Sequence, residues 1–392
     1  MGKKREEDPG LKYLMKINFN RARGKHALED RWQRDFGKTR TNELYDIYTS
    51  LKIGSKEFYE FKNSDYSLSK SFSEVFDGDI IRKACNYVAS HKEYFGETIL
   101  DVGCDIGYIT GFLALTFPDS RIISIDRSPN AVKYAKDFVD KLGVTNVEFR
   151  NCDLEEVEEQ FDTVFCARTI QENINSDDMP FDGEPIRFQF ARYAAMTENY
   201  TKTLMRHVKP EGSLFIFERL GHDPLLCGWL LELNNNECAF LKDTYQEFKC
   251  EEVSKTSTFQ GFICIPGNTM LVSEICEFWF AALDLDPTRV GMIEGWQALV
   301  YTDKNAGELI RGIYILDRGE KVGRFVAFYD KDDPSLIYYL AVSSGNEMRV
   351  YAYSADNKEE ILQHMEETIR VNKAHGMTFR EYNPEEDLWE GV

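Results

Sequence analysis

Hydrophobic and polar positions follow three different patterns along the chain of 392 residues. In residues 1–95 the apolar positions recur at helical spacing within a polar background, which predicts amphipathic helices near Leu11–Phe19, Asn42–Leu51 and Ile80–Ser90. The aromatic segment Phe58–Phe72 lies between the last two of these helices. We therefore expect a helical N-terminal region that serves as an arm or a lid.

From Thr98 the pattern changes to short apolar runs that alternate with helical stretches, as is typical of βαβ units and a mostly parallel sheet. The predicted strands are Thr98–Val102, Arg121–Ile125, Val147–Arg150, Thr163–Cys166 and Ser213–Glu218. The predicted helices are Ile109–Phe117, Asn130–Leu142, Phe188–Val208 and Leu225–Leu241. Two further runs, Tyr245–Val253 and Phe259–Ile265, predict a hairpin that closes the sheet. Residues 96–267 thus read as one α/β domain.

Residues 268–392 predict an α+β accessory domain with an antiparallel meander. Helices are expected at Ser273–Leu283 and Lys358–Asn372. Strands are expected at Trp296–Tyr301, Gly312–Leu316, Gly323–Tyr329, Leu336–Ser343 and Met348–Tyr353. This region carries no motif that indicates a function, and a role as a substrate-binding or dimer-forming element is open to it.

The stretch Thr98–Ala114 carries the strongest functional signal. An apolar strand ends in Asp101, and the chain then turns through Gly103 and Gly107 into a helix. Backbone amides and the positive end of that helix would face the crevice at the carboxyl edge of the sheet, where nucleotide-like ligands bind. Glycine lets the backbone approach such a ligand closely.

Two more acids follow at the ends of the next two strands. Asp126 ends the second strand, about 20 residues beyond the glycine turn, where a carboxylate can accept from ribose hydroxyls. Asp153 follows the third strand, beside the apolar Leu154, where it could accept from an adenine amino group. Three acids at three successive strand ends are a more specific signal of such a binding site than any one of them alone.

These residues resemble the motifs of the class I methyltransferases that use S-adenosylmethionine (SAM): D-x-G-x-G-x-G after the first strand, an acid after the second and an Asp after the third. The resemblance covers about residues 96–267 and implies a seven-stranded, mostly parallel Rossmann-like methyltransferase sheet, with the helical lid before it and the α+β domain after it. SAM is the implied cofactor. The sequence departs from the pattern where Asp105 replaces the middle glycine, and an acid there could accept from the amino group of SAM. The predicted cofactor-binding residues are Asp101, Gly103, Asp105, Gly107, Asp126, Arg127, Asp153, Leu154 and Arg168.

A nicotinamide-dependent dehydrogenase is the alternative on a related fold. Its G-x-G-x-x-G fingerprint makes room for a pyrophosphate, but here Asp105 and Tyr108 stand at the second and third glycine positions. A carboxylate beside a pyrophosphate would repel it, so SAM is favoured over NAD.

Candidate catalytic residues lie after the fourth and fifth strands. Glu172, in the polar run after the fourth strand, could hold or deprotonate a methyl acceptor. His222, after the fifth, is the one of six histidines that this interpretation places at the carboxyl end of a strand. Each also has an ordinary explanation, as a capping or surface acid and as a loop histidine.

Composition and charge limit the partners. Nine scattered cysteines with no C-x-x-C pair argue against a disulfide framework and a zinc site, so no metal is expected. The charged N-terminus and the lack of an apolar run of about 20 residues predict a cytoplasmic protein without a membrane segment. The net charge of −20 makes nucleic acid an improbable partner, except through residues 1–40, where basic residues outnumber acidic ones. That arm could instead dock on the acidic body.

We expect methylation of a small-molecule acceptor, neutral or cationic because the body is acidic. Two alternatives remain: a methyltransferase acting on protein or tRNA, and a SAM-binding sensor or scaffold without catalysis. A homodimer formed through the C-terminal domain is a further expectation.

Overall fold

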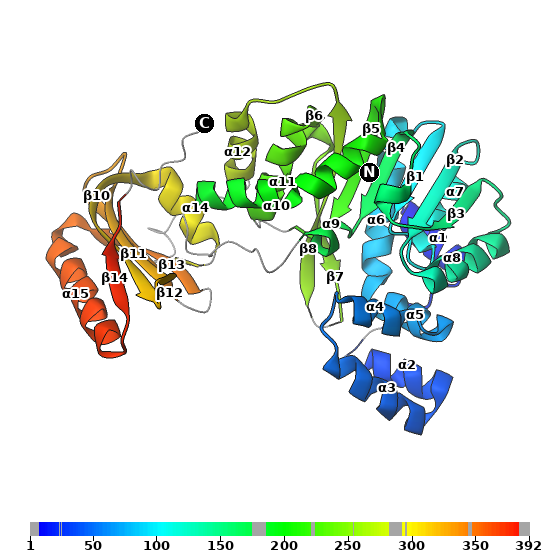
Figure 1. Ribbon diagram of the computed structural model, residues 1–392, viewed down its shortest axis with the longest axis horizontal. Coiled ribbons are helices and arrows are strands. Elements are labelled where there is room, and N and C mark those ends of the chain that lie inside the picture. The colour runs from blue at the N-terminus through cyan, green and yellow to red at the C-terminus, as the bar shows by residue number, and fades with distance from the viewer. Residues whose placement is uncertain are drawn as a thin grey trace, which may run out of the picture. The chain divides into compact units, whose positions relative to one another are not determined.

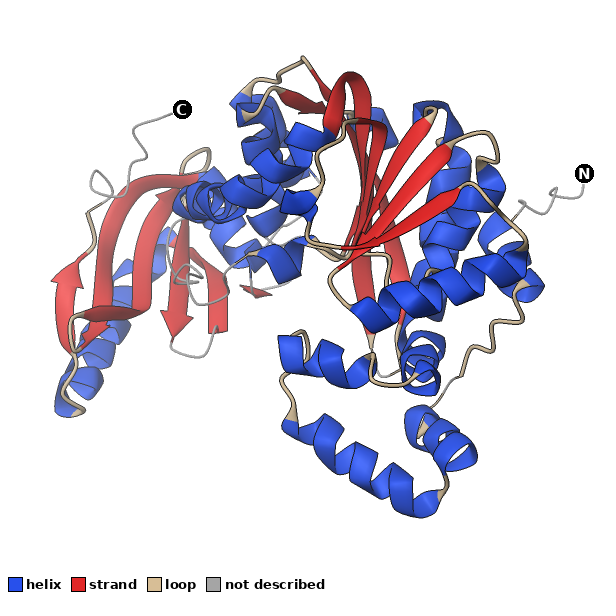
Figure 2. Ribbon diagram, turned by 45° about the vertical axis from the view of Figure 1, so that its right-hand side comes forward, coloured by secondary structure: helices blue, strands red, loops and turns tan. Residues whose placement is uncertain are grey.

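The computed structural model describes residues 8–22, 24, 26–174, 186–220, 224–253, 255–281, 292–294, 296–343 and 347–383. The chain forms two compact units, whose elements are labelled in Figure 1 and coloured by type in Figure 2. The first unit comprises Met1–Ile174, Asn199–Gly221 and Leu233–Thr269. The second comprises Asn175–Glu198, His222–Glu232 and Met270–Val392.

The first unit is built on an eight-stranded sheet in the order β3-β2-β1-β4-β5-β8-β6, with β7 also paired to β8. Its parallel strands are β1 (Thr98–Val102), β2 (Arg121–Asp126), β3 (Val147–Asn151), β4 (Phe161–Ala167) and β5 (Val208–Glu218). The antiparallel strands are β6 (Cys238–Phe240), β7 (Gln246–Glu251) and β8 (Thr256–Pro266). The predicted α/β class, the five parallel strands and the closing hairpin are confirmed. The sheet has one strand more than the seven expected, the short β6, which lies in the region predicted as the end of a helix.

Helices follow the parallel strands β1, β2, β4 and β5 along the chain, and the helix after β5 leads to the antiparallel β6. They are α7 (Tyr108–Thr116), α8 (Pro129–Leu142), α9 (Ile170–Asn173), α10 (Ile186–His207) and α11 (Pro224–Asn235). Local sequence explains the bounds of α8: the Ser128 side chain accepts from the Ala131 amide at 3.3 Å, and Gly143 ends the helix in a left-handed conformation.

One face of this sheet packs against α6 (Gly78–Ser90), α7, α8 and the N-terminal helix α1 (Pro9–Lys16). Its core members on the strands include Ile99, Ile122 and Phe215, and those on the helices include Val88 and Phe112. The neighbouring strand residues on the other face are buried as well, as central parallel strands require.

Four short helices precede α6 and form a core of their own: α2 (Ala27–Phe36), α3 (Lys38–Ser50), α4 (Lys56–Lys62) and α5 (Tyr66–Phe72). Trp32 is fully buried in this core, packs edge-to-face on Phe72 and donates to Ser71 Oγ at 2.7 Å. Phe58 and Phe72, from the predicted aromatic segment, belong to the same core. A π-helical turn, Ser73–Asp77, joins α5 to α6.

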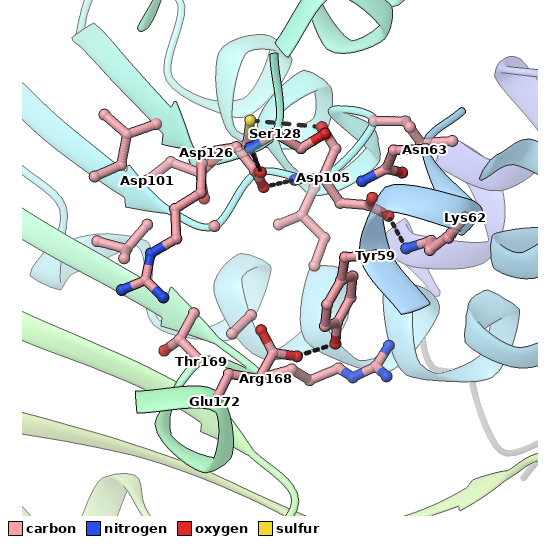
Figure 3. A pocket seen from close by; sticks show the side chains of 18 of the residues that line it. Tyr59, Lys62, Asn63, Asp101, Asp105, Asp126, Ser128, Arg168, Thr169 and Glu172 are labelled. Carbon is pink, nitrogen blue, oxygen red and sulfur yellow. Dashed lines mark hydrogen bonds and ion pairs between the residues drawn. The ribbon is translucent and has the colours of Figure 1, made fainter. Parts of the chain in front are cut away.

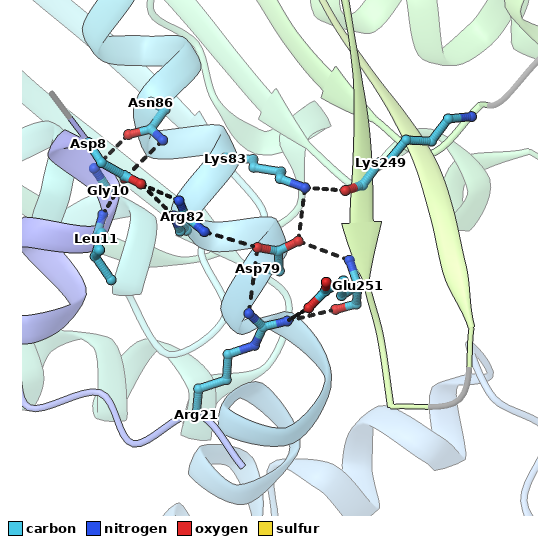
Figure 4. Close-up of polar contacts among 10 residues, drawn as sticks. All are labelled: Asp8, Gly10, Leu11, Arg21, Asp79, Arg82, Lys83, Asn86, Lys249 and Glu251. Atoms are coloured by element: carbon cyan, nitrogen blue, oxygen red, sulfur yellow. Dashed lines mark hydrogen bonds and ion pairs between the residues drawn. The ribbon is translucent and has the colours of Figure 1, made fainter. Parts of the chain in front are cut away.

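The start of the chain is held against α6 and β7 by ion pairs (Figure 4). Asp8 accepts from the guanidinium of Arg82, with Nε at 2.8 Å. Arg21 lies 3.6 Å from Asp79 and 3.3 Å from Glu251 on β7. Within the described part of the basic arm, Arg21 therefore docks on acidic residues of the protein itself.

The second unit holds a six-stranded antiparallel sheet in the order β14-β10-β11-β12-β13-β9. Its strands are β9 (Met292–Glu294), β10 (Ala306–Asp317), β11 (Glu320–Asp330), β12 (Leu336–Ser343), β13 (Glu347–Ser354) and β14 (Thr378–Glu381). Helix α15 (Lys358–Ala374) packs on one face and α14 (Trp296–Asn305) on the other, because alternate residues of β11 and β12 belong to the two cores. The predicted meander is present, but the strand predicted at Trp296–Tyr301 is wrong, since this segment is α14. The unit also includes α12 (Val272–Ala281). Across the described parts of both units, no helix is long and apolar enough to cross a membrane.

Gly107, which precedes α7, provides a test of close packing. Its φ is +83°, and an added Cβ would lie 2.9 Å from Ala135 on α8, whereas Gly143, with φ +72°, has open space around it. We expect Gly107→Ala to lower the free energy of unfolding by about 2–4 kcal/mol, from backbone strain and overpacking together. Gly143→Ala should cost only the strain, about 1 kcal/mol. Equal losses in denaturant titrations would contradict the assigned close approach.

Candidate active site

A cavity of about 840 Å³ opens in the first unit at the carboxyl ends of β1, β2 and β4 (Figure 3). Most of the predicted site residues line it: Asp101, Gly103, Asp105, Asp126, Arg127, Leu154, Arg168 and Glu172. Gly107 and Asp153 are not among its lining residues. The strand ends therefore bring predicted residues together in one cavity, although Asp101 and Glu172 are 71 positions apart in the sequence.

Asp101 is the most deeply buried of these acids. Its Oδ2 accepts from Thr110 Oγ1 at 2.6 Å and from Ser124 Oγ at 2.8 Å. Burial raises its pKa to about 6, against the opposing effect of these two hydrogen bonds. Asp101 thereby ties together β1, α7 and β2 beneath the cavity.

Asp126 fixes the turn that follows β1. Its Oδ2 accepts from the Asp105 amide at 2.9 Å, and its Oδ1 accepts from the Ser128 amide at 2.8 Å. Burial is the main cause of its raised pKa, and the nearby Asp105 adds to it. Gly103 has φ +76° and Asp105 φ +48°, so this turn is left-handed at a non-glycine residue.

Asp105 is paired with a lysine that the sequence did not indicate. Lys62, at the end of α4, places Nζ 2.8 Å from Asp105 Oδ2, and only 8% of this residue is exposed. Burial alone would lower the pKa of Lys62, but the carboxylates of Asp105 and Asp77 outweigh it and the pKa is raised. The cavity therefore presents an ammonium and a carboxylate side by side.

Arg127 and Asp153 form an ion pair with each other. Arg127 also donates to Asn173 Oδ1 at 2.9 Å, which connects the end of β2 to α9. Asp153 caps the short 3-10 helix Leu154–Glu156, and Leu154 contributes an apolar side chain to the cavity wall. The proposed contact from Asp153 to an adenine stays a prediction.

Glu172 lies across the cavity from the glycine turn and accepts a hydrogen bond from the Tyr59 hydroxyl (Figure 3). Burial is the largest cause of its raised pKa. Next to it, Arg168 has φ +60° and donates to Asp77 Oδ1 at 2.5 Å, from the π-helical turn. Arg168, predicted among the cofactor residues, thus lies on the Glu172 side of the cavity.

A buried acid supports this side from below. Glu218, at the end of β5, is 1% exposed and accepts from the Thr169 amide at 2.5 Å and the Ile170 amide at 3.2 Å. Thr169 Oγ1 in turn accepts from the Tyr200 hydroxyl at 2.6 Å, and Tyr200 lines the cavity. Glu218 therefore anchors the start of α9, the helix that carries Glu172.

His222 lies outside the described residues, so its catalytic role stays a prediction. Among the residues that the sequence did not single out, Lys62, Asp77 and Tyr200 line the cavity together with Tyr59 of the aromatic segment. No local motif marks these positions, because each reaches the site through packing of a distant helix. No cluster of His, Cys, Asp and Glu in the described part of the chain is arranged to hold a metal ion.

Residues 94–258 match the family model of a methyltransferase domain. Malonyl-[acyl-carrier protein] O-methyltransferase of Acetivibrio thermocellus is 43% identical over 75 residues, which cover 19% of this chain and 25% of that protein. tRNA U34 carboxymethyltransferase of Campylobacter curvus is 32% identical over 131 residues, which cover 33% of this chain and 40% of that protein. (S)-Tetrahydroprotoberberine N-methyltransferase of Eschscholzia californica is 23% identical over 188 residues, covering 40% and 54%.

This chain thus spans between a quarter and about half of the length of these relatives. The match and the strand order confirm the predicted class I methyltransferase domain and SAM as its cofactor. The three relatives are named for different acceptors, so they leave the acceptor of this chain open.

The buried Glu218 predicts a pH dependence of stability. Burial raises its pKa from 4.5 to about 7 in the folded state, so folding favours the protonated acid. The stabilisation from this group is complete below about pH 4.5 and is lost as the pH rises to about 7. Glu218→Gln keeps an acceptor for the Thr169 amide but cannot ionise, so its melting temperature should fall less than that of the wild type between pH 5 and pH 8. Parallel melting curves for the two proteins would contradict this assignment.

Proposed function

We propose that this chain, which carries a class I SAM-dependent methyltransferase domain, transfers a methyl group to a small-molecule acceptor bound beside Glu172. The observation that carries the proposal is the cavity of about 840 Å³, which is lined both by the glycine turn and by Glu172, Tyr59 and Arg168. A volume of this size is in the range of sites for small ligands.

The residues around the glycine turn suit SAM in chemistry and charge. Asp126 offers carboxylate oxygens for ribose hydroxyls, and Leu154 offers an apolar surface for adenine. The paired Lys62 and Asp105 are complementary to the carboxylate and the ammonium of the methionine end. Once bound, SAM supplies an already activated methyl group, so the protein's task is to align the acceptor and to accept its proton.

Glu172 is the proposed proton acceptor. It lines the cavity, burial raises its pKa, and Tyr59 holds its orientation. Arg168 and Asp77 neutralise each other beside it. Glu218 holds α9 in place from the buried side, as a positioning residue.

The N-terminal helices are proposed as the lid of this site. Helix α4 supplies Tyr59 and Lys62, and the π-helical turn supplies Ser73 and Asp77 to the cavity wall. A wall built from these helices restricts access, which favours a small acceptor over a macromolecule.

Methylation of tRNA or protein is the second candidate, because one relative is named for tRNA and another for an acyl-carrier protein. A SAM sensor without catalysis is the third.

Cofactor binding can be tested by calorimetry with SAM, and with NADH as the competing ligand. Asp126→Asn should raise the Kd for SAM about 10- to 100-fold, since it weakens charge-assisted hydrogen bonds to the ribose. Lys62→Met should raise it about tenfold, but should leave the Kd for 5′-methylthioadenosine unchanged because that compound lacks the amino-acid end. Asp137→Asn, on the exposed side of α8, is the control. Tight NADH binding, or equal losses for both nucleosides in Lys62→Met, would refute these assignments.

The acceptor size can be tested with methyl-labelled SAM and a cell extract separated into small molecules and macromolecules. We expect label in the small-molecule fraction with the wild type, and about 100-fold slower labelling with Glu172→Gln at unchanged SAM affinity, because the proton acceptor is lost. Label confined to the macromolecular fraction, with a rate that falls steeply with salt, would favour tRNA. SAM binding without any labelled product would favour the sensor.

A further inference from the structure

We propose that the acceptor is a small primary or secondary amine, which binds as its ammonium ion at Glu172 and loses a proton to it before methylation. This inference rests on the proposed function and names the substrate class of the same site.

The first support is the unequal pairing of charges around the cavity. The cations Arg168 and Lys62 already have carboxylate partners, Asp77 at 2.5 Å and Asp105 at 2.8 Å. Glu172, by contrast, accepts a hydrogen bond from a neutral partner, the Tyr59 hydroxyl, and the charges of Arg168 and Lys62 act on it without forming an ion pair within the described residues. Glu172 is therefore the carboxylate in this part of the cavity whose charge a cationic ligand would neutralise.

The second support is the aromatic side chain beside that carboxylate. Tyr59 turns its hydroxyl to Glu172 and lines the cavity with its ring, and Lys62 Nζ already stands 5.9 Å from the centre of this ring. Aromatic rings attract ammonium groups through their negative faces. A carboxylate and a ring in contact form a surface suited to an ammonium group.

The third support is the direction in which charge moves during the reaction. An amine acceptor changes from a cation to a neutral nucleophile and then becomes a cation again as it gains the methyl group. The Glu172 carboxylate stabilises the cation that binds, and it stabilises the methylated cation again once it has released the proton. A hydroxyl or carboxylic acid acceptor would instead develop or carry negative charge beside the Glu172 carboxylate, and this repulsion raises its energy.

The proton and electron balance needs no further reactant. The ammonium group gives one N–H proton to the Glu172 carboxylate, and the freed lone pair forms the new N–C bond to the methyl carbon. The electron pair of the breaking S–C bond stays on sulfur, so the cofactor leaves as S-adenosylhomocysteine. The product is a methylated ammonium ion, and Glu172 releases its proton to solvent.

The test uses the full chain, methyl-labelled SAM and the small-molecule fraction of a cell extract. One portion of that fraction is treated with acetic anhydride and then with mild alkali, which blocks primary and secondary amines as amides but restores hydroxyl groups. We expect a labelled product that binds a cation exchanger, and a loss of about tenfold or more in labelling with the acetylated portion.

A binding measurement gives a readout that does not depend on turnover. The purified labelled product is dialysed to equilibrium against wild type, Glu172→Gln and the surface control Glu43→Gln, each saturated with S-adenosylhomocysteine. We expect about tenfold weaker retention by Glu172→Gln alone, because Gln keeps the hydrogen bond to Tyr59 but lacks the charge.

The outcomes separate this inference from the proposed function. A labelled product that is neutral or anionic, that releases its label as methanol in alkali, or that forms equally in the acetylated portion would overturn the amine assignment while leaving a methyltransferase. Equal retention by Glu172→Gln and wild type would overturn the role of Glu172 in binding it. No labelled product in the untreated small-molecule fraction would overturn the proposed function itself.

Discussion

The crowding of carboxylates at one edge of a parallel sheet is the constraint on which the site depends. Asp101, Asp105, Asp126 and Glu172 line one cavity, and Glu218 is buried close to it. Like charges gathered in one place are costly, and a buried carboxylate without donors is more so, which is why these acids are matched by hydroxyls, amides or cations. Hydroxyls of neighbouring elements serve Asp101, and backbone amides serve Asp126 and Glu218. For Asp105 and Glu172 the donors come from α4, so the N-terminal helices are part of the electrostatic balance of the site as well as its covering.

The part of this arrangement that sequence could predict is the part set by short-range pattern. The turn from Asp101 through Gly103 to Gly107, and the acid Asp126 at the next strand end, follow from strand periodicity and from the fixed geometry of βαβ units. The Lys62–Asp105 and Tyr59–Glu172 contacts join residues 43 and 113 positions apart. No periodicity constrains which polar residue of a surface helix meets which loop, so such pairs emerge only from the packed fold.

Two local errors show where pattern misleads. The run Trp296–Tyr301 was predicted as a strand because it is short and apolar, but α14 buries the adjacent residues Ala298 and Leu299 against the sheet, and a helix can present such neighbours to one surface. The predicted helix Leu225–Leu241 continued too far. Helix α11 ends at Asn235, Glu237 takes φ +55°, and Cys238–Phe240 then pairs with β8. The Asn234–Asn236 run was the available stop signal, because asparagine favours helix ends and turns.

The two halves of the site differ in how their acids are held, and the proposed function gives these acids different tasks. On the cofactor side, Asp126 is fixed by two backbone amides, so it is a rigid acceptor whose proton affinity is a by-product of burial. On the opposite side, Glu172 is held by one hydroxyl on a helix of four residues, and that helix is anchored through Glu218. The pKa of Asp126 and the pKa of Glu172 are both raised, chiefly by burial, and the charge of Glu172 further raises the pKa of Glu218. A group that must take up and release a proton benefits from such loose, low-donor surroundings, whereas a group that must only hold a ligand benefits from being fixed. The asymmetry in donors therefore argues for Glu172, rather than Asp126, as the acid that exchanges protons in this cavity.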